Sequence, residues 1–253
     1  MGQLVNVVVA DGVATITLDS PANRNALSHQ LLADLHDALD VADTEHPRVI
    51  VLTHTAPVFC AGADLKERST GRVDSTSFVH AMERLATTSA PVIAAVDGPV
   101  RAGGIGLMAA CDLVVVNSSI TFAFTEVRIG VAPAIITWPI LQRCGWSKLA
   151  APYLTGEVFD AVRALDMGLV THVTDDVGAT TAELCRNTML GGPHAVAMTK
   201  TLLRGTHTTA ELQALSESLF TSAEGREGMA AFIEKRQPAW CGDDPSRTDP
   251  SGD

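Results

Sequence analysis

Segments with the pattern of buried β-strands alternate with segments of helical periodicity through most of the chain. Short apolar runs at residues 48–53, 92–96 and 113–116 have the length and composition of buried strands. Helical spacing of apolar residues follows Ser28, and a glycine-rich stretch at residues 97–107 follows the second strand pattern. This alternation favours an α/β fold.

The two ends of the chain have patterns of their own. Two short runs rich in β-branched residues, 4–9 and 13–18, flank the dipeptide Asp11-Gly12. Such a dipeptide between two strand patterns predicts a β-hairpin, because a type I′ turn needs positive φ at both central residues. Residues 180–235 are almost wholly helical in pattern. Residues 242–253 are polar and rich in Asp, Ser and Pro, so we expect them to be disordered.

Composition excludes several classes of protein. The chain has 253 residues, of which 46% are hydrophobic, and this is typical of an ordered globular protein. A net charge of −11 argues against a nucleic-acid-binding face, although Arg24, Lys66 and Lys235 could form a local patch for a phosphorylated ligand. The five cysteines form no CxxC metal or redox motif, and their odd number and the size of the chain argue against a disulfide scaffold and for a reducing compartment. Neither a signal peptide nor a membrane span is visible, so we expect a soluble cytoplasmic protein.

The glycine-rich stretch has more than one interpretation. Gly104, Gly106 and Ala109 match the relaxed dinucleotide-binding pattern G-x-G-x-x-A, with Glu126 twenty residues beyond Gly106. In that motif the glycines follow the strand at once, whereas residues 97–103 intervene here. The spacing therefore disfavours a dinucleotide site. Glycines that allow tight helix packing are a second, purely structural, interpretation.

Four separate segments, in order along the chain, resemble signatures of the crotonase (enoyl-CoA hydratase/isomerase) superfamily. They span the chain from about residue 20 to residue 240, and each is weak alone. In the last segment Trp240 replaces the usual phenylalanine. The segments are Pro21–Leu27 (N-x-x-N-A-L type), Pro57–Lys66 (F-x-A-G-A-D-L-K type), Asp97–Leu107 (glycine-rich) and Gly225–Trp240 (E-G-x-x-A-F-x-E-K-R type).

The resemblance implies both a fold and an assembly. The expected fold is a ClpP/crotonase-like ββα spiral core at residues 1–190, followed by a helical trimerisation region at residues 191–240 and a disordered tail at residues 241–253. The implied assembly is a homotrimer or a dimer of trimers. The implied partner is an acyl-CoA thioester, with no nucleic acid, no membrane and no permanently bound cofactor; coenzyme A arrives as part of the substrate.

The resemblance also implies an oxyanion hole formed by the backbone amides of Ala63 and Gly103. A thioester oxygen gains negative charge as an enolate forms, and amides at a helix N-terminus are preset donors for it. Lys66 could meet a coenzyme A phosphate, or it could be an ordinary solvated lysine. The residues implied to contact substrate or coenzyme A are Ala22, Arg24, Ala61, Ala63, Asp64, Leu65, Lys66, Gly103, Gly104, Pro133 and Lys235.

Glu126 matches one of the two catalytic glutamates of the hydratases in this superfamily, and Gly106 occupies the position of the other. Glu126 could instead be a first-turn glutamate that complements a helix dipole. In an apolar pocket, desolvation would raise its pKa toward neutrality, which suits a proton-transferring group. Gly106 cannot take part in acid/base chemistry.

Three activities are consistent with these residues. Hydration of a 2-enoyl-CoA is the first expectation, because some bacterial hydratases of the superfamily also have glycine at the position of Gly106. A double-bond isomerase that uses Glu126 alone is the second, and an acyl-CoA-binding protein with little turnover is the third. We expect no metal, and no acid/base role for His54 or His80. Candidates for the far wall of the acyl pocket are Phe78, Met82, Ile136 and Trp138.

Overall fold

The computed structural model describes residues 2–69 and 75–241. This part of the chain divides into two compact units, with the boundary between Cys185 and Arg186. The segment boundaries expected from the sequence stay predictions, and residues 242–253 of the expected tail lie outside the described residues.

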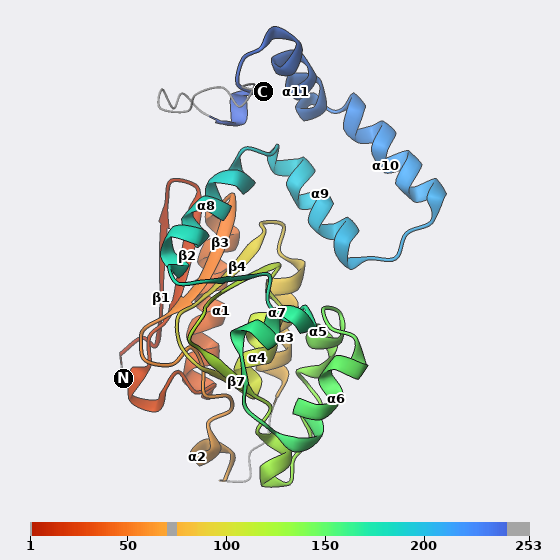
Figure 1. Ribbon diagram of the computed structural model, residues 1–253. Helices are drawn as coiled ribbons and strands as arrows, with labels where there is room; N and C mark the ends of the chain where they lie inside the picture. The colour runs from red at the N-terminus through yellow and green to blue at the C-terminus, as the bar shows by residue number, and fades with distance from the viewer. Residues whose placement is uncertain (1, 70–74, 242–253) are drawn as a thin grey trace. The chain divides into compact units, whose positions relative to one another are not determined.

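The first unit is built on a mixed β-sheet with the strand order β1-β2-β3-β4-β6-β9. The β1–β2 pair is antiparallel and each following pair is parallel. Figure 1 shows β1 to β4 side by side, coloured from red to yellow. The strands are β1 (Val5–Ala10), β2 (Val13–Leu18), β3 (Val49–His54), β4 (Val92–Val96), β6 (Leu113–Asn117) and β9 (His172–Thr174).

The hairpin expected at the start of the chain is confirmed. Asp11 and Gly12 join β1 to β2 and have φ angles of 49° and 76°. Positive φ at both central residues gives the turn the twist that the two strands need. Every second residue of β2 is buried, so one face of this outer pair packs against the core while the other is partly exposed.

Helices α1 (His29–Glu45) and α3 (Thr76–Thr87) pack against each other, and α1 also packs against β1 and β2. The N-cap expected at Ser28 is confirmed, because its side chain accepts a hydrogen bond from the Leu31 amide at 3.1 Å. The buried face of α1 is apolar at helical spacing except for Asp34, whose carboxylate accepts from the Leu4 amide. All five residues of β4 are buried, which agrees with its continuous apolar sequence.

The glycine-rich stretch connects the two sheets of the first unit. After β4, the chain forms β5 (Val100–Arg101), which belongs to a smaller sheet of order β5-β7-β8. Helix α4 (Gly103–Ala109) follows at once, and all its residues are buried. The other strands of this sheet are β7 (Thr121–Ala123) and β8 (Phe159–Asp160). The start of α4 is therefore buried in the interior, and the glycines at its first two residues allow the close packing there.

One expected helix is much shorter in the structure. The pattern of residues 133–144 predicts a helix, but α5 covers only Thr137–Leu141. Pro139 lacks an amide hydrogen, so it is tolerated in the first turn of a helix but not in its interior. A helix that began at residue 133 would place Pro139 in its second turn. Residues 131–136 instead form an irregular segment.

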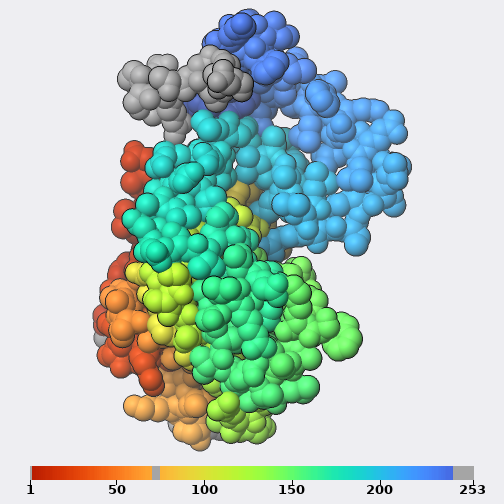
Figure 2. Space-filling model, viewed as in Figure 1, coloured from red at the N-terminus to blue at the C-terminus, as the bar shows by residue number. Residues whose placement is uncertain are grey.

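Helices α6 (Trp146–Thr155) and α7 (Ala161–Met167) follow on the surface of the first unit, in shades of green in Figure 2. Asp160 caps α7 by accepting from the Arg163 amide at 2.8 Å, as its sequence position predicts. Within the described residues, no helix has the length and apolar composition to cross a membrane.

The second unit is helical. Helix α8 (Val177–Met189) contains the boundary between the units, and α9 (Pro193–Arg204), α10 (Thr209–Thr221) and α11 (Ala223–Glu234) follow. The carboxylate of Glu224 accepts from the first amides of α9, which links α11 to α9. A short 3-10 turn, η3 (Ala239–Cys241), completes the described chain, and Trp240 donates to the carbonyl of Leu190 at 3.0 Å.

Candidate active site

A cavity of about 360 Å³ lies in the first unit, between the segments that the sequence motifs identified. Its walls are mostly apolar, and the ionisable side chains among its lining residues are Glu126 and Arg68. Such cavities, with few polar groups in an apolar lining, are typical of small-molecule sites. The lining residues are Leu27, Ala61, Ala63, Leu65, Arg68, Ser75, Phe78, Ala102, Gly103, Thr125, Glu126, Ile129 and Val131–Ile136.

The backbone of Ala63 is positioned by a bridge to Leu27. Leu27 donates to the carbonyl of Gly62 at 2.8 Å, and Asp64 donates to the carbonyl of Leu27. Successive peptide groups of an extended chain point in opposite directions. The amide of Ala63, between these two bonded groups, therefore points away from Leu27, and Ala63 lines the cavity.

Gly103 is the first residue of α4, so its amide has no acceptor within the helix. The residue before it, Ala102, has φ 47° and ψ −121°, a strained backbone conformation for a residue with a side chain. The Ala102 amide donates to the carbonyl of Ala123 at 3.0 Å, which fixes this turn against β7. Gly62 packs directly against Ala102 and the Gly103 amide, so the two segments meet at the cavity wall.

Glu126 begins η2 (Glu126–Ile129), a short 3-10 helix after β7, and its side chain is half-buried at the cavity. Burial raises the pKa of its carboxyl group above the ordinary value of 4.5, and a hydrogen bond from its own backbone amide partly opposes that shift. Its Oε2 atom is buried and has no hydrogen-bond partner among the described residues. A carboxylate in such surroundings accepts a proton more readily than an exposed one.

Gly106 lies on α4, and the space where its side chain would extend is filled by Ile136. A Cβ atom at residue 106 would lie 2.4 Å from Cγ2 and 2.6 Å from Cβ of Ile136. Ile136 is itself buried and lines the cavity. Any side chain at residue 106 would therefore require Ile136 and the segment around it to move. The glycine here permits close packing rather than a special backbone angle.

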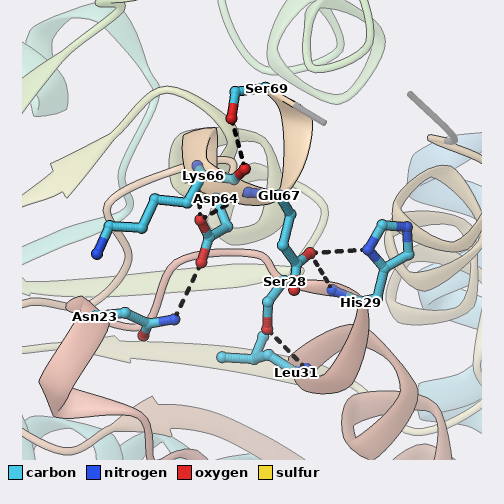
Figure 3. A network of polar contacts seen from close by, with 8 residues as sticks. All are labelled: Asn23, Ser28, His29, Leu31, Asp64, Lys66, Glu67 and Ser69. Carbon is cyan, nitrogen blue, oxygen red and sulfur yellow. Dashed lines mark hydrogen bonds and ion pairs between the residues drawn. The ribbon is translucent and has the colours of Figure 1, made fainter. Parts of the chain in front are cut away.

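A network of polar contacts forms around the start of α2 (Leu65–Arg68), as shown in Figure 3. The carboxylate of Asp64 caps α2 by accepting from the amides of Lys66 and Glu67, and it lies 3.5 Å from Nδ2 of Asn23. Glu67 in turn accepts from the backbone amide of His29, and its carboxylate contacts the His29 ring at 2.8 Å. These contacts hold α2 against the start of α1, while the side chain of Lys66 extends away from the network (Figure 3).

Ala22 and Arg24 lie on an exposed turn beside this network, at η1 (Pro21–Asn23). The carbonyl of Arg24 accepts from the amide of Ala61 at 3.0 Å. Asn25, the next residue, is fully buried, and its side chain joins three segments. It accepts from the Ser20 amide at 2.7 Å and donates to the carbonyls of Thr55 and Val58. Asn25 therefore fixes the turn and the segment before Ala61 in one arrangement.

The residues expected at the site fall into three groups. Six of them line the cavity, namely Ala61, Ala63, Leu65, Gly103, Glu126 and Pro133. Five others are close to cavity-lining residues in the sequence but do not line the cavity themselves. Ala22, Arg24, Asp64 and Lys66 belong to the adjoining turns, and Gly104 packs against Cys60. Lys235 caps α11 in the second unit, so its relation to the cavity stays a prediction.

Two of the four candidates for the far wall line the cavity. Phe78 and Ile136 do so, whereas Met82 is fully buried in the core and Trp138 packs against the core from outside it. Sequence reasoning missed Arg68 as a lining residue and Asn25 as the residue that joins the loops. The asparagine of the N-x-x-N-A-L element was the available signal for Asn25.

The two histidines considered in the sequence have other surroundings. Nε2 of His54 accepts from the Asp97 amide at 3.1 Å, and burial lowers the pKa of the His54 ring. His80 packs beside His36, with ring centroids 5.1 Å apart. Neither is among the cavity-lining residues described above. The described residues also contain no group of three or more acidic, histidine or cysteine side chains that could hold a metal ion.

Comparison with known proteins identifies the family. The sequence pattern of the enoyl-CoA hydratase/isomerase family matches residues 9–243. The chain belongs to the enoyl-CoA hydratase/isomerase family. It is 33% identical to the enoyl-CoA isomerase/hydratase fer4 of Mycosarcoma maydis, over 91% of this chain and 93% of that protein. It is 31% identical to the mevalonyl-coenzyme A hydratase sidH of Aspergillus fumigatus, over 90% of this chain and 91% of that protein.

Solved structures of the family agree with the fold. An enoyl-CoA hydratase from Mycobacterium avium has a TM-score of 0.73 and is 41% identical, over 95% of this chain and all of that one. An enoyl-CoA hydratase from Mycobacterium smegmatis has a TM-score of 0.88 and is 29% identical, over 94% of this chain and 98% of that one. The crotonase-family membership and α/β fold expected from the sequence are therefore confirmed. The relatives have names for more than one reaction, so family membership leaves the reaction to be argued from the site.

Proposed function

We propose that this chain is an acyl-CoA enzyme that works through a thioester enolate, with Glu126 as its proton-transferring group. In this proposal the amides of Ala63 and Gly103 hold the thioester oxygen as it gains negative charge. The observation that carries the proposal is that both residues line one cavity with Glu126, whose carboxyl pKa is raised by burial. An acyl-CoA thioester as substrate is consistent with the family.

The proposed reaction is a double-bond shift in a 3-enoyl-CoA. The Glu126 carboxylate removes a proton from C2, and the electrons of that bond pass to the thioester oxygen, which gives a dienolate. The same group then returns the proton to C4 while the electrons move back, so the double bond ends between C2 and C3. One carboxylate is enough for both steps, and no co-reactant is consumed.

The packing at Gly106 favours this reaction over hydration. Ile136 fills the space that a second carboxylate would need, and the neighbouring wall of the cavity, residues 131–136, consists of apolar side chains. A water molecule that attacks an enoyl-CoA must be oriented and deprotonated while a proton is delivered to C2. A site with Glu126 and an isoleucine offers fewer polar groups for that task than a site with two glutamates.

Hydration of a 2-enoyl-CoA, the first expectation from the sequence, is the second candidate. Its support comes from relatives: the fer4 protein has both activities in its name, and the two mycobacterial structures are named hydratases. In this case Glu126 would both activate the water and deliver the proton. The enolate and the two amides would have the same roles in both reactions.

The coenzyme A part of the substrate is proposed to lie along the turns beside the cavity. Ala22, Arg24, Asp64 and Lys66 lie on neighbouring turns, and the side chains of Arg24 and Lys66 are exposed. Two cations on the surface beside an apolar cavity suit a ligand with a phosphorylated end and an acyl end.

The test is the change Glu126→Gln, with Glu83→Gln on the exposed face of α3 as the matched control. Conversion of a 3-enoyl-CoA to the 2-enoyl-CoA, and hydration of crotonyl-CoA, are each followed by ultraviolet absorption. We expect the 3-enoyl-CoA reaction to dominate and to fall by about 10²- to 10⁴-fold in the Glu126 variant alone. Dominant hydration that depends on Glu126 would select the second candidate.

Two further results would overturn the proposal. Unchanged turnover in the Glu126→Gln variant would remove Glu126 from its role. Tight binding of acyl-CoA esters without either reaction would instead indicate a binding protein with little turnover, the third possibility raised by the sequence.

A further inference from the structure

Tyr153 is the single tyrosine of the chain and lies on α6, directly behind the segment that contains Glu126. Helix α6 packs against η2, the short helix that Glu126 begins. The Tyr153 ring packs against Phe124, with 4.3 Å between the ring centroids. Phe124 precedes Glu126 by two residues on the same segment. Tyr153 of α6 therefore packs against the segment that carries the Glu126 carboxylate.

Two buried polar atoms lack partners in this region. The hydroxyl oxygen of Tyr153 is buried and has no hydrogen-bond partner among the described residues, and the same holds for Oε2 of Glu126. The hydroxyl of a buried tyrosine usually finds a partner, and leaving a buried polar group unpaired costs about 1–3 kcal/mol. One group is a donor and the other an acceptor, so each can supply what the other lacks.

The two groups also interact electrostatically. Burial raises the pKa of Tyr153 to about 12; the Thr137 hydroxyl opposes that shift, and the negative charges of Glu126 and Cys144 add to it. The Thr137 hydroxyl is thus close to that of Tyr153, but the two do not meet the geometry of a hydrogen bond. The Thr137 hydroxyl already donates to the carbonyl of Pro133 at 2.6 Å. It could serve Tyr153 only as a neutral acceptor, and hydrogen bonds to an ionised acceptor are about twice as strong.

We propose that Tyr153 is a positioning residue for Glu126, and that its hydroxyl donates a hydrogen bond to Oε2 of the Glu126 carboxylate when substrate is bound. This inference rests on the proposed role of Glu126. Catalytic hydrogen bonds often tighten only in the complex with substrate. The bond holds the carboxylate in one orientation and stabilises its ionised form, which partly offsets the cost of its burial.

Tyr153 acts through Glu126 rather than on the substrate. It is absent from the described residues that line the cavity. Loss of its hydroxyl is therefore expected to change kcat and the pH dependence of the reaction while leaving KM close to its original value.

The first experiment compares Tyr153→Phe with Ser147→Ala, which removes an exposed hydroxyl from the same helix. The phenylalanine keeps the ring that packs on Phe124. We expect kcat to fall about tenfold in Tyr153→Phe with KM changed less than twofold, and no change in Ser147→Ala. We also expect the acidic limb of the kcat profile, which reports ionisation in the complex with substrate, to move up by about one pH unit, since the ionised carboxylate loses a donor.

Cys144 also acts on Tyr153, but it does not titrate in the pH range of the acidic limb. Burial raises the pKa of the Cys144 thiol to about 11, so it stays neutral through the acidic limb. The charged groups beside Cys144 are Arg143 and Lys148, which partly oppose that shift. A fall in kcat without any shift of the profile would indicate a merely structural tyrosine, and would overturn the proposal.

The second experiment needs no turnover. Because the chain has one tyrosine, carbon-13 labelling at Cζ gives a single NMR signal from Tyr153. In the protein with a saturating, non-reactive acyl-CoA thioether, we expect this signal to shift with pH as Glu126 titrates, and to stay constant in Glu126→Gln. A signal that is constant in the original protein, or that shifts equally in both, would overturn the pairing. This result stands even if the proposed reaction is wrong.

Discussion

The role proposed for Glu126 has a cost in the stability of the fold. Its carboxyl group is half-buried beside apolar residues, and burial raises its pKa. In the unfolded chain the same group ionises near its ordinary value of 4.5. Between that value and the raised pKa, the unfolded state binds fewer protons than the folded state, so folding becomes less favourable as the pH rises. The charge that the proposed role of Glu126 requires therefore destabilises the fold as the pH rises.

The difference in the pKa of Glu126 between the folded and unfolded states gives a prediction about the stability of Glu126→Gln. We expect the variant to unfold at a higher temperature than the original protein at pH 8, because glutamine has no charge to bury. The difference should shrink as the pH falls through the raised pKa toward 4.5, because the carboxyl group of the folded protein then becomes protonated and loses its charge. Thermal denaturation followed by circular dichroism checks this, with Glu83→Gln as control. An equal gap at both pH values would contradict it.

Gly106 gives the second prediction at the scale of one residue. A Cβ there would lie 2.4 Å from the side chain of Ile136, so Gly106→Ala is expected to cost about 1–3 kcal/mol in the free energy of unfolding. Ile136→Ala alone should also destabilise, since it leaves a cavity. In the double variant the two costs should be less than additive, because the new methyl group enters the vacated space. Strict additivity in urea unfolding would mean that the two residues do not compete for space.

At the scale of elements, the loops that form the site are held by one buried amide. Asn25 bonds to the segments before η1 and after β3, and this fixes the approach to Ala61 and Ala63. The short helices α2 and η2 add little stability by themselves, because a helix this short is not stable alone. The position of α2 depends on the cap from Asp64 and on the bond from the His29 amide to Glu67, and η2 is held by its packing against α6.

We therefore expect Asn25→Ala to be costly. It leaves the Ser20 amide and the carbonyls of Thr55 and Val58 without their buried partner, and each such loss costs about 1–3 kcal/mol. The expected loss of unfolding free energy is at least about 3 kcal/mol. Asn23→Ala is the control, since Asn23 is half-buried and its side chain makes fewer bonds, one from the Ser20 hydroxyl at 2.8 Å and a long contact with Asp64 at 3.5 Å. Similar losses for both in urea unfolding would contradict this role.

At the scale of the whole molecule, the second unit leaves large apolar side chains exposed. Phe232 is 86% exposed and Leu203 is 83% exposed, and Phe220 and Ile233 are also exposed. Clusters of such residues on a soluble protein commonly mark surfaces that associate. The family resemblance implies a trimer or a dimer of trimers, so self-association remains our expectation for this unit.

Native mass spectrometry tests that expectation. We expect the protein to give a trimer or a hexamer, and Phe232→Asp to shift the distribution toward the monomer, because a buried, unpaired carboxylate opposes association. Val8→Asp, at an exposed residue of β1 in the first unit, is the matched control. A monomer for the unmodified protein at micromolar concentration would contradict the expectation.

Local patterns in the sequence were enough to predict features that depend on neighbouring residues. The Asp11-Gly12 hairpin, the Ser28 cap and the buried strand at β4 follow from turn angles, capping and apolar periodicity. The glycine-rich stretch and its companion motifs predicted the family, which the comparisons confirm.

Only the tertiary structure decided which distant residues meet. The sequence contains Gly106 and Ile136, yet their competition for one space depends on how α4 packs against the segment before α5. In the same way, nothing near Tyr153 in the sequence indicates that its hydroxyl shares a buried region with Glu126. Periodicity fixes which face of an element is buried, whereas packing of elements far apart in the chain determines what each buried face contacts.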